Sequence, residues 1–391
     1  MPRAVYVLAL GIFAMVTSEF AVAGLMPQLA EGLDVTVPQV GYLITAFSVA
    51  MSFGGPFLAI SLLRMRQKYA LMVLFAVFLV GNLLAATASG YPVMLVARVV
   101  SGVAAQAFFG ISISLAAQLA RPELRGRVIA VLMNGLMLGT LLGLPLATVI
   151  GERLGWRAAF WAVAVLTVAV ALGTLAGVPD ADHAEGGGSL RTELGALRNR
   201  RLWLAFVTST LIIGATFSLF SYVNPILTGI TGFDAGSVPL LLVAYGAATV
   251  VGNTVVGRLA DRYALPVLAV GLALNAVFLA GLALFAQLRV PAVGLLLGVG
   301  LVGVTMNPAM ASRVQRIGNP RPLVNTVHNA FITLGVILGS LLGGIAIDVQ
   351  GLRAVLWLGV AMAVAGLLTL VPDALRARST VSGQGPGAGG E

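Results

Sequence analysis

The chain contains no cysteine and has few charged residues, one lysine and two histidines. Without cysteine, disulfides, thiolate metal sites and cysteine nucleophiles are excluded. The only lysine, Lys68, follows Gln67, so the phosphate-binding loop G-x-x-x-x-G-K-[ST] is absent and ATP hydrolysis at such a loop is excluded. The histidines, His183 and His328, form no recognisable metal motif, and we expect neither a metal nor a cofactor.

Charged residues make up 9% of the chain, whereas ordinary soluble domains have about 25%. Hydrophobic residues make up 59%, and the mean hydropathy is +1.01. This composition predicts a polytopic protein of the lipid bilayer. The formal net charge of +9 is spread in short groups between apolar runs, which is typical of a membrane topology signal and excludes a nucleic-acid partner.

Apolar runs of spanning length indicate an all-α integral membrane protein with twelve transmembrane helices. They fall at about residues 4–29, 39–62, 69–88, 92–120, 128–151, 157–178, 201–229, 237–258, 266–286, 290–316, 323–348 and 352–371. The first run is much longer than the core of a signal peptide, so we interpret it as a retained span.

Twelve spans place both termini on one side of the membrane. If that side is cytoplasmic, 18 of the 23 basic residues lie in inner segments and four lie in outer loops, with Arg98 alone inside a span. This asymmetry predicts cytoplasmic termini. We therefore expect a multi-pass protein of the bacterial inner (cell) membrane.

The spans divide into two halves. We expect a six-helix bundle at 1–178, a cytoplasmic linker at 179–200, a second six-helix bundle at 201–372 and a disordered cytoplasmic tail at 373–391. The pair Gly139-x-x-x-Gly143 and the later GWRAAFW recur 196 residues on as Gly335-x-x-x-Gly339 and GLRAVLW. A parallel repeat of this kind predicts a binding site near the membrane midplane between the bundles.

One carboxylic acid, Glu19, lies inside the first span, and an ionisable group there marks a functional site by default. Its expected partner is Arg98 of the fourth span. Helical rise puts the two residues ~12 and ~9 Å below the same membrane face. A buried carboxyl group beside a fixed positive charge can load and release a proton. The alternatives are a structural acid at Glu19 and a clamp from Arg98 to main-chain carbonyl groups.

Several motifs resemble those of the major facilitator superfamily. Gly257, Asp261 and Arg262 match its G-x-x-x-D-R signature, and Arg98-x-x-x-Gly102 is similar to its fourth-span motif. Glu19 lies eight residues before Pro27, as does the acid of drug:proton antiporters. The first forty residues resemble actinobacterial chloramphenicol-resistance exporters. The resemblance implies two six-helix bundles, proton coupling at Glu19 and Arg98, and gating by the following residues: Gly139, Gly143, Pro145, Gly257, Asp261, Arg262, Gly335 and Gly339. The glycines could instead serve close packing, and Asp261 with Arg262 could be a solvated loop pair.

Polar and aromatic side chains within the spans are the candidate solute contacts. They are Gln106, Asn134, Phe217, Tyr222, Asn224, Tyr245, Asn253, Asn307 and Asn329. We expect His328 at the membrane interface. With one acid and one base in the spans, the sequence favours a neutral or weakly charged organic solute.

We therefore predict a monomeric secondary transporter, not an enzyme, that exports a small drug-like molecule in exchange for protons by alternating access. A chloramphenicol-like compound fits, and so does a sugar, a nucleobase or a secondary metabolite. An importer or uniporter differs only in its coupling. A non-transporting sensor would need a larger soluble domain, and a membrane-embedded enzyme would need a catalytic motif that the sequence does not show.

Overall fold

A computed structural model describes residues 3–62, 65–119, 125–179, 199–318 and 322–382. These residues form helices and connecting turns with no strand, and twelve of the helical segments are long and apolar enough to cross a membrane. The twelve predicted spans are confirmed, with ends that differ by a few residues. The predicted linker lies outside the described residues except at its ends. The last helix continues to Ser382, nine residues beyond the predicted start of the tail at residue 373, and 383–391 lie outside the described part.

The first bundle contains the elements of the N-terminal half. They are α1 (Arg3–Gly24), α2 (Met26–Leu33), α3 (Val37–Val49), the π-helical turn η1 (Ala50–Gly54), α4 (Gly55–Ser61), α5 (Gln67–Ala86), α6 (Tyr91–Leu119), α7 (Arg125–Leu154) and α8 (Trp156–Gly177). Helices α3 and α4 with η1 form one span, whose π-helical turn precedes Pro56. Because proline has no N–H group, it cannot donate the regular bond to the carbonyl group four residues back.

The second bundle repeats this order. Its elements are α10 (Arg200–Phe220), α11 (Val223–Gly229), η3 (Ala235–Ser237), α12 (Val238–Phe285), α13 (Arg289–Val302), η4 (Val304–Met306), α14 (Asn307–Gly318), α15 (Pro322–Gln350) and α16 (Ala354–Ser382). Helix α12 contains two spans joined by a kink at Tyr263, three residues before Pro266. The span of α13 and α14 is broken by the 3-10 turn η4 in its middle, a feature that spans tolerate where the backbone is buried or lines a cavity.

The sequence repeat has a structural counterpart in both bundles. Gly155 precedes α8 with φ +84°, and Gly351 precedes α16 with φ +81°. Both conformations are in the left-handed region, which favours glycine. The two positions are 196 residues apart, and each one reverses the chain between the last two spans of its bundle.

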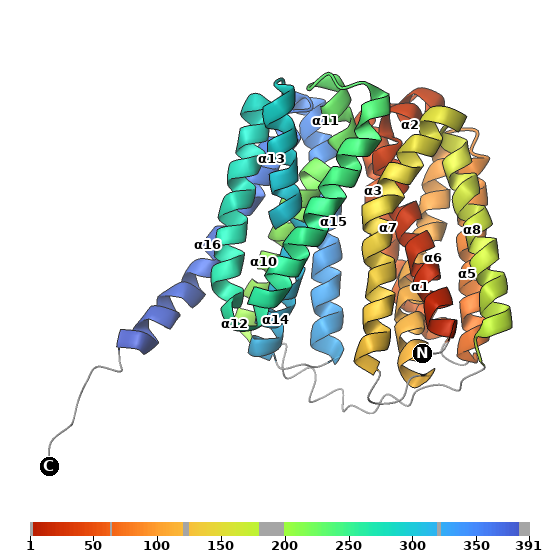
Figure 1. Cartoon of the computed structure of the whole chain (residues 1–391), viewed down its shortest axis with the longest axis horizontal. Helices are drawn as coiled ribbons and strands as arrows, with labels where there is room; N and C mark the ends of the chain where they lie inside the picture. Colours follow the sequence, from red (N-terminus) through yellow and green to blue (C-terminus); the bar gives the residue numbers. More distant parts are fainter. Residues whose placement is uncertain (1–2, 63–64, 120–124, 180–198, 319–321, 383–391) are drawn as a thin grey trace, which may run out of the picture.

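Helices cross the molecule from one side to the other, and both ends of the described chain lie on the same side (Figure 1). We call the side that carries Arg3 and Ser382 the terminal side and the opposite side the far side. The two bundles meet mainly where α3 packs on α15 and where α7 packs on α12, with smaller contacts of α11 on α1 and α2. Any solute path between the bundles must run along these helices.

Candidate functional site

Arg98 of α6 is buried and forms a clamp on α1. Its Nη1 donates to the main-chain oxygen of Ser18 at 2.9 Å, and its Nη2 donates to the main-chain oxygen of Glu19 at 3.1 Å. The guanidinium carbon lies 4.2 Å from the centre of the Phe47 ring of α3, a cation–π distance. Arg98 thus joins three spans of the first bundle through contacts that need no ion pair.

The clamp extends to Asn82 of α5, which the sequence interpretation did not select. The hydroxyl group of Ser18 donates to Oδ1 of Asn82 at 2.9 Å, and Nδ2 of Asn82 donates to the main-chain oxygen of Phe78. Both Ser18 and Asn82 are buried. The amides among the candidate solute contacts are selected because they lie inside membrane spans, and the same criterion applies to Asn82.

Glu19 is half-buried in α1, and its charge and that of Arg98 are close enough to interact. The carboxylate nevertheless forms no ion pair within 4.0 Å among the described residues, because Arg98 binds the main chain instead. The next residue, Phe20, faces the second bundle: its ring lies 6.1 Å from Phe217 and 5.3 Å from Phe220. The acid is therefore placed beside the interface between the bundles.

A cavity of about 100 Å³ lies at this interface, between α7 on one side and α12 with the broken span of α13 and α14 on the other. Three predicted solute contacts meet in it: Tyr245, Asn253 and Asn307. Its other polar lining residues are threonines that the sequence interpretation did not select, namely Thr140, Thr249 and Thr305. No lining residue is charged, so this cavity offers hydroxyl and amide groups to a neutral molecule.

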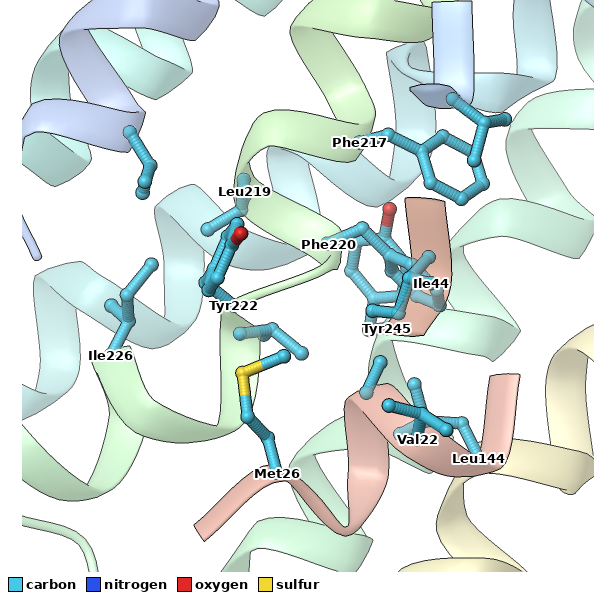
Figure 2. Packing of buried hydrophobic residues seen from close by; sticks show 14 of the residues in the cluster. Val22, Met26, Ile44, Leu144, Phe217, Leu219, Phe220, Tyr222, Ile226 and Tyr245 are labelled. Carbon is cyan, nitrogen blue, oxygen red and sulfur yellow. The ribbon is translucent and has the colours of Figure 1, made fainter. Parts of the chain in front are cut away.

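A group of aromatic rings packs around Tyr245, which lines this cavity. Phe220 lies 5.6 Å from the ring of Tyr245 and 5.5 Å from that of Phe217, and Phe20 packs against this pair from the first bundle. Figure 2 shows Phe217, Phe220 and Tyr245 grouped beside Ile44, Val22 and Leu144 of the first bundle. The predicted Phe217 thus belongs to an apolar layer between the bundles.

The predicted residues Tyr222 and Asn224 lie nearer the far side and are fully buried. Tyr222 occupies the break between α10 and α11, and its hydroxyl group donates to the main-chain oxygen of Ser340 at 2.7 Å while it packs against Gly41 of the first bundle. Nδ2 of Asn224 donates to the main-chain oxygen of Gly24 in the first bundle. In this conformation both side chains join the bundles, and neither lines a described cavity.

Two further hydrogen bonds join α3 to α15 in the far-side half. The hydroxyl groups of Thr45 and Ser340 lie 2.8 Å apart, and the hydroxyl group of Tyr42 donates to Asp348 at 3.3 Å. On the terminal side, a cavity of about 400 Å³ opens among α4, α5 and α6, and Thr326 of α15 contributes to its wall. The two bundles are thus joined by hydrogen bonds on the far side, and the first bundle carries a cavity in its terminal-side half.

The remaining predicted solute contacts lie apart from the interface cavity. Gln106 lines the cavity of about 400 Å³. Asn134 of α7 and Asn329 of α15 are exposed in the terminal-side half of their helices. His328, which we expected at the membrane–water interface, is instead buried within the second bundle. Its Nε2 lies 2.9 Å from the hydroxyl oxygen of Ser209, and its ring stacks on Phe206.

The paired glycines lie at equivalent contacts inside the two bundles. A Cβ at Gly139 or Gly143 of α7 would lie 2.8 Å from Val16 or Thr17 of α1. A Cβ at Gly335 or Gly339 of α15 would lie 2.6 Å from a main-chain oxygen of α10. These glycines let helices approach closely within each bundle. Pro145 lies inside α7, two residues after Gly143.

The G-x-x-x-D-R signature near the kink of α12 is less closely packed than the paired glycines. A Cβ at Gly257 would have no atom within 4 Å, and the guanidinium carbon of Arg262 lies 5.5 Å from the Tyr263 ring. The side chain of Asp261 lies outside the described part. Among the described residues, no group of three or more histidine, aspartate or glutamate side chains could hold a metal ion.

Twelve spans in two repeated bundles, with a polar cavity between them, define a multi-pass membrane transporter. The family model of the Major Facilitator Superfamily matches residues 8–236 and 207–388. The chain belongs to the major facilitator superfamily, and it is a transporter rather than an enzyme.

Relatives with similar sequences extend over almost the whole chain. A chloramphenicol resistance protein of Streptomyces lividans is 33% identical over 95% of this chain and 96% of its own length. The MFS-type transporter YtbD of Bacillus subtilis (strain 168) is 30% identical over 93% of each chain.

Solved structures share the fold at low sequence identity. A bacterial homologue of the human lysosomal transporter Spinster, in an inward-facing and occupied conformation, has a TM-score of 0.77 at 15% identity over 98% of each chain. The nucleoside transporter NupG has a TM-score of 0.73 at 15% identity over 94% of this chain and 98% of its own. The predicted fold class is confirmed.

Proposed function

We propose that this transporter exports a small neutral or weakly charged organic molecule in exchange for protons by alternating access. The observation that carries the proposal is the arrangement of Glu19. Its main chain is fixed by Arg98, its carboxylate has no ion-pair partner among the described residues, and the next residue packs against the wall between the bundles. A free acid at this position can gain and lose a proton while the clamp stays intact.

The direction of transport rests on charge and on shape. Basic residues concentrate in the terminal-side segments, which makes that side cytoplasmic under the positive-inside rule. The cavity of about 400 Å³ among α4, α5 and α6 then lies in the cytoplasmic half, and the hydrogen bonds of Asn224 and Thr45 join the bundles on the outer side. A solute would enter from the cytoplasm, and protonation of Glu19 from outside would accompany the return. The membrane is a bacterial inner membrane, and one chain contains the whole transport path.

The solute class follows from the uncharged lining of the interface cavity. Hydroxyl and amide groups of Thr140, Asn253 and Asn307 suit a polar but neutral molecule, and Tyr245 offers an aromatic surface. The relative named as a chloramphenicol resistance protein makes chloramphenicol the first compound to test. Sugars, nucleobases and other antibiotics form the rest of the panel.

Transport in proteoliposomes tests the proposal. With an imposed pH gradient, the unmodified protein should move chloramphenicol or another panel compound against its concentration gradient. Glu19→Gln should abolish this uphill movement but keep solute exchange in the absence of a gradient, which also reports folding. Glu31→Gln, at an exposed acid of α2, should behave like the unmodified protein. Undiminished uphill transport by Glu19→Gln would refute the coupling role, and solute movement that ignores the pH gradient in the unmodified protein would refute the exchange.

A further inference from the structure

Three arginines line a second cavity, which lies on the terminal side of the second bundle and away from the transport path. This cavity has a volume of about 250 Å³. Its lining residues are Arg201, Ala264, Leu265, Arg313, Arg316, Ile317 and Asp373. They come from the terminal-side ends of α10 and α14, from Asp373 within α16 and from the kink of α12. With one carboxylate against three guanidinium groups, the cavity carries a net charge of +2 at neutral pH.

One of the three arginines is already engaged. Arg313 donates through Nε at 3.1 Å and through Nη2 at 2.8 Å to Oδ2 of Asp373, and its Nη1 donates to the hydroxyl oxygen of Thr208 at 2.8 Å. Thr208 also lies 2.7 Å from the hydroxyl oxygen of Thr369. This network joins α10, α14 and α16, and it holds Arg313 in a fixed position at the cavity wall.

The other two arginines are available for a ligand. The guanidinium groups of Arg201 and Arg316 have no hydrogen-bond or ion-pair partner among the described residues, and both side chains are exposed. Two free guanidinium groups beside a fixed third one form an arrangement that suits a tetrahedral oxyanion, because each group can offer parallel N–H donors to phosphate oxygens.

The remaining wall is apolar, and the cavity lies where spans end. Ala264, Leu265 and Ile317 line it beside the arginines. On α10, Trp203 follows Arg201 by two residues and is partly exposed, as aromatic residues at a membrane–water boundary commonly are. A ligand with a phosphate group and an apolar chain would satisfy both parts of this wall.

We propose that this arginine cavity binds a phosphate group, and that the headgroup of an anionic phospholipid from the adjacent leaflet supplies it. Anionic lipid headgroups gather basic residues at the cytoplasmic membrane surface. Here the phosphate would bridge Arg201 of α10 to Arg316 of α14, next to the network of Arg313. The site is separate from Glu19 and from the interface cavity.

Lipid binding to the purified full chain tests the proposal. Native mass spectrometry with added phosphatidylglycerol should show one tightly held lipid on the unmodified protein. Arg201→Gln combined with Arg316→Gln should weaken this binding at least tenfold, whereas Arg258→Gln, at an exposed arginine of the same side outside the cavity, should leave it unchanged. Equal binding to the double variant and the unmodified protein would overturn the site.

Two further measurements complete the test. One distinguishes headgroup binding from loss of folding, and the other distinguishes a lipid phosphate from a soluble one. Asp373→Asn removes the competing carboxylate and should tighten phosphatidylglycerol binding several-fold, an effect that loss of folding cannot produce; unchanged or weaker binding would count against a headgroup in the cavity. Inorganic phosphate at millimolar concentration should raise the melting temperature less than phosphatidylglycerol does. If phosphate alone gives the full arginine-dependent shift, the lipid assignment is wrong and a soluble phosphate compound is the ligand.

Discussion

Arg98 binds Glu19 through the main chain, with Nη2 donating to the carbonyl oxygen at 3.1 Å, and leaves the carboxylate without an ion pair among the described residues. The sequence allows either a charge pair or a carbonyl clamp, and in this conformation the structure has the clamp. The distinction matters for mechanism because the acid can change its protonation without breaking the hydrogen bonds that hold α1 to α6.

The clamp predicts that lysine cannot replace Arg98. A guanidinium group reaches two carbonyl oxygens at once, whereas an ammonium group on a flexible stem cannot hold the same fork. We expect Arg98→Lys to lower the free energy of unfolding by about 2 kcal/mol, the loss of one hydrogen bond from a charged donor. Detergent-titration unfolding measures this change. Arg258→Gln is the control, and equal stability of Arg98→Lys and the unmodified protein would contradict the clamp.

The glycines between helices predict that alanine destabilises the protein at close helix contacts and not at an open position. A methyl group at Gly135 would collide with the main-chain oxygen of Ala9, and at Gly335 it would lie 2.6 Å from that of Thr210. Each alanine substitution should cost about 1–3 kcal/mol through overpacking. Gly294→Ala is the matched control, since nothing lies within 4 Å of its Cβ position in α13 and alanine favours a helix by about 1 kcal/mol. If Gly135→Ala and Gly335→Ala are as stable as Gly294→Ala, the packing role is contradicted.

Closure of the far side predicts a change in thiol labelling, which is simple to measure because the chain has no cysteine. Ile226→Cys places a thiol at a position that is 2% exposed in α11. We expect slow labelling by a membrane-impermeant maleimide in that background. Gly41→Ala should make it several-fold faster, because the added methyl group collides with the hydroxyl group of Tyr222 and separates the bundles. Gly294→Ala should leave the rate unchanged, and identical rates in all three backgrounds would show that Gly41 and Tyr222 do not maintain the closure.

The interface cavity predicts a loss of transport without a loss of folding. Asn253→Leu removes an amide and fills part of the cavity, so kcat/KM for export should fall about fivefold or more, as for the loss of a hydrogen bond near 1 kcal/mol. Thr254→Leu is the control on the next residue, which is exposed and whose hydroxyl group bonds only its own helix. Full activity of Asn253→Leu would remove this cavity from the solute path.

The number and order of the spans could be predicted from the sequence because a bilayer sets a minimum length for apolar runs. The repeat could be predicted because two motifs recur at the same offset of 196 residues, and Gly155 and Gly351 have matching backbone conformations. The breaks within spans, at Tyr222 and at Gly303, were not predicted. They follow from packing between neighbouring helices, which a run of apolar letters does not encode.

The candidate site was predicted only in part. Tyr245, Asn253 and Asn307 do share a cavity, but Tyr222 and Asn224 lie in the far-side closure, Asn134 and Asn329 are exposed, and Asn82 was missed. Each of these residues carried the same signal, a polar or aromatic side chain in an apolar span. The signal gave no information on which neighbour each side chain would meet.

By itself, the sequence determined that this chain crosses a membrane twelve times, which side carries the positive charge, and that one acid lies within the first span. The tertiary structure alone decided that Arg98 binds carbonyl oxygens, that three threonines join the interface cavity, and that Arg201 and Arg316 face the same space. The physical reason is that lipid and a packed neighbour are both apolar. The hydrophobic pattern of a span therefore fixes its length but says little about which face turns toward which helix.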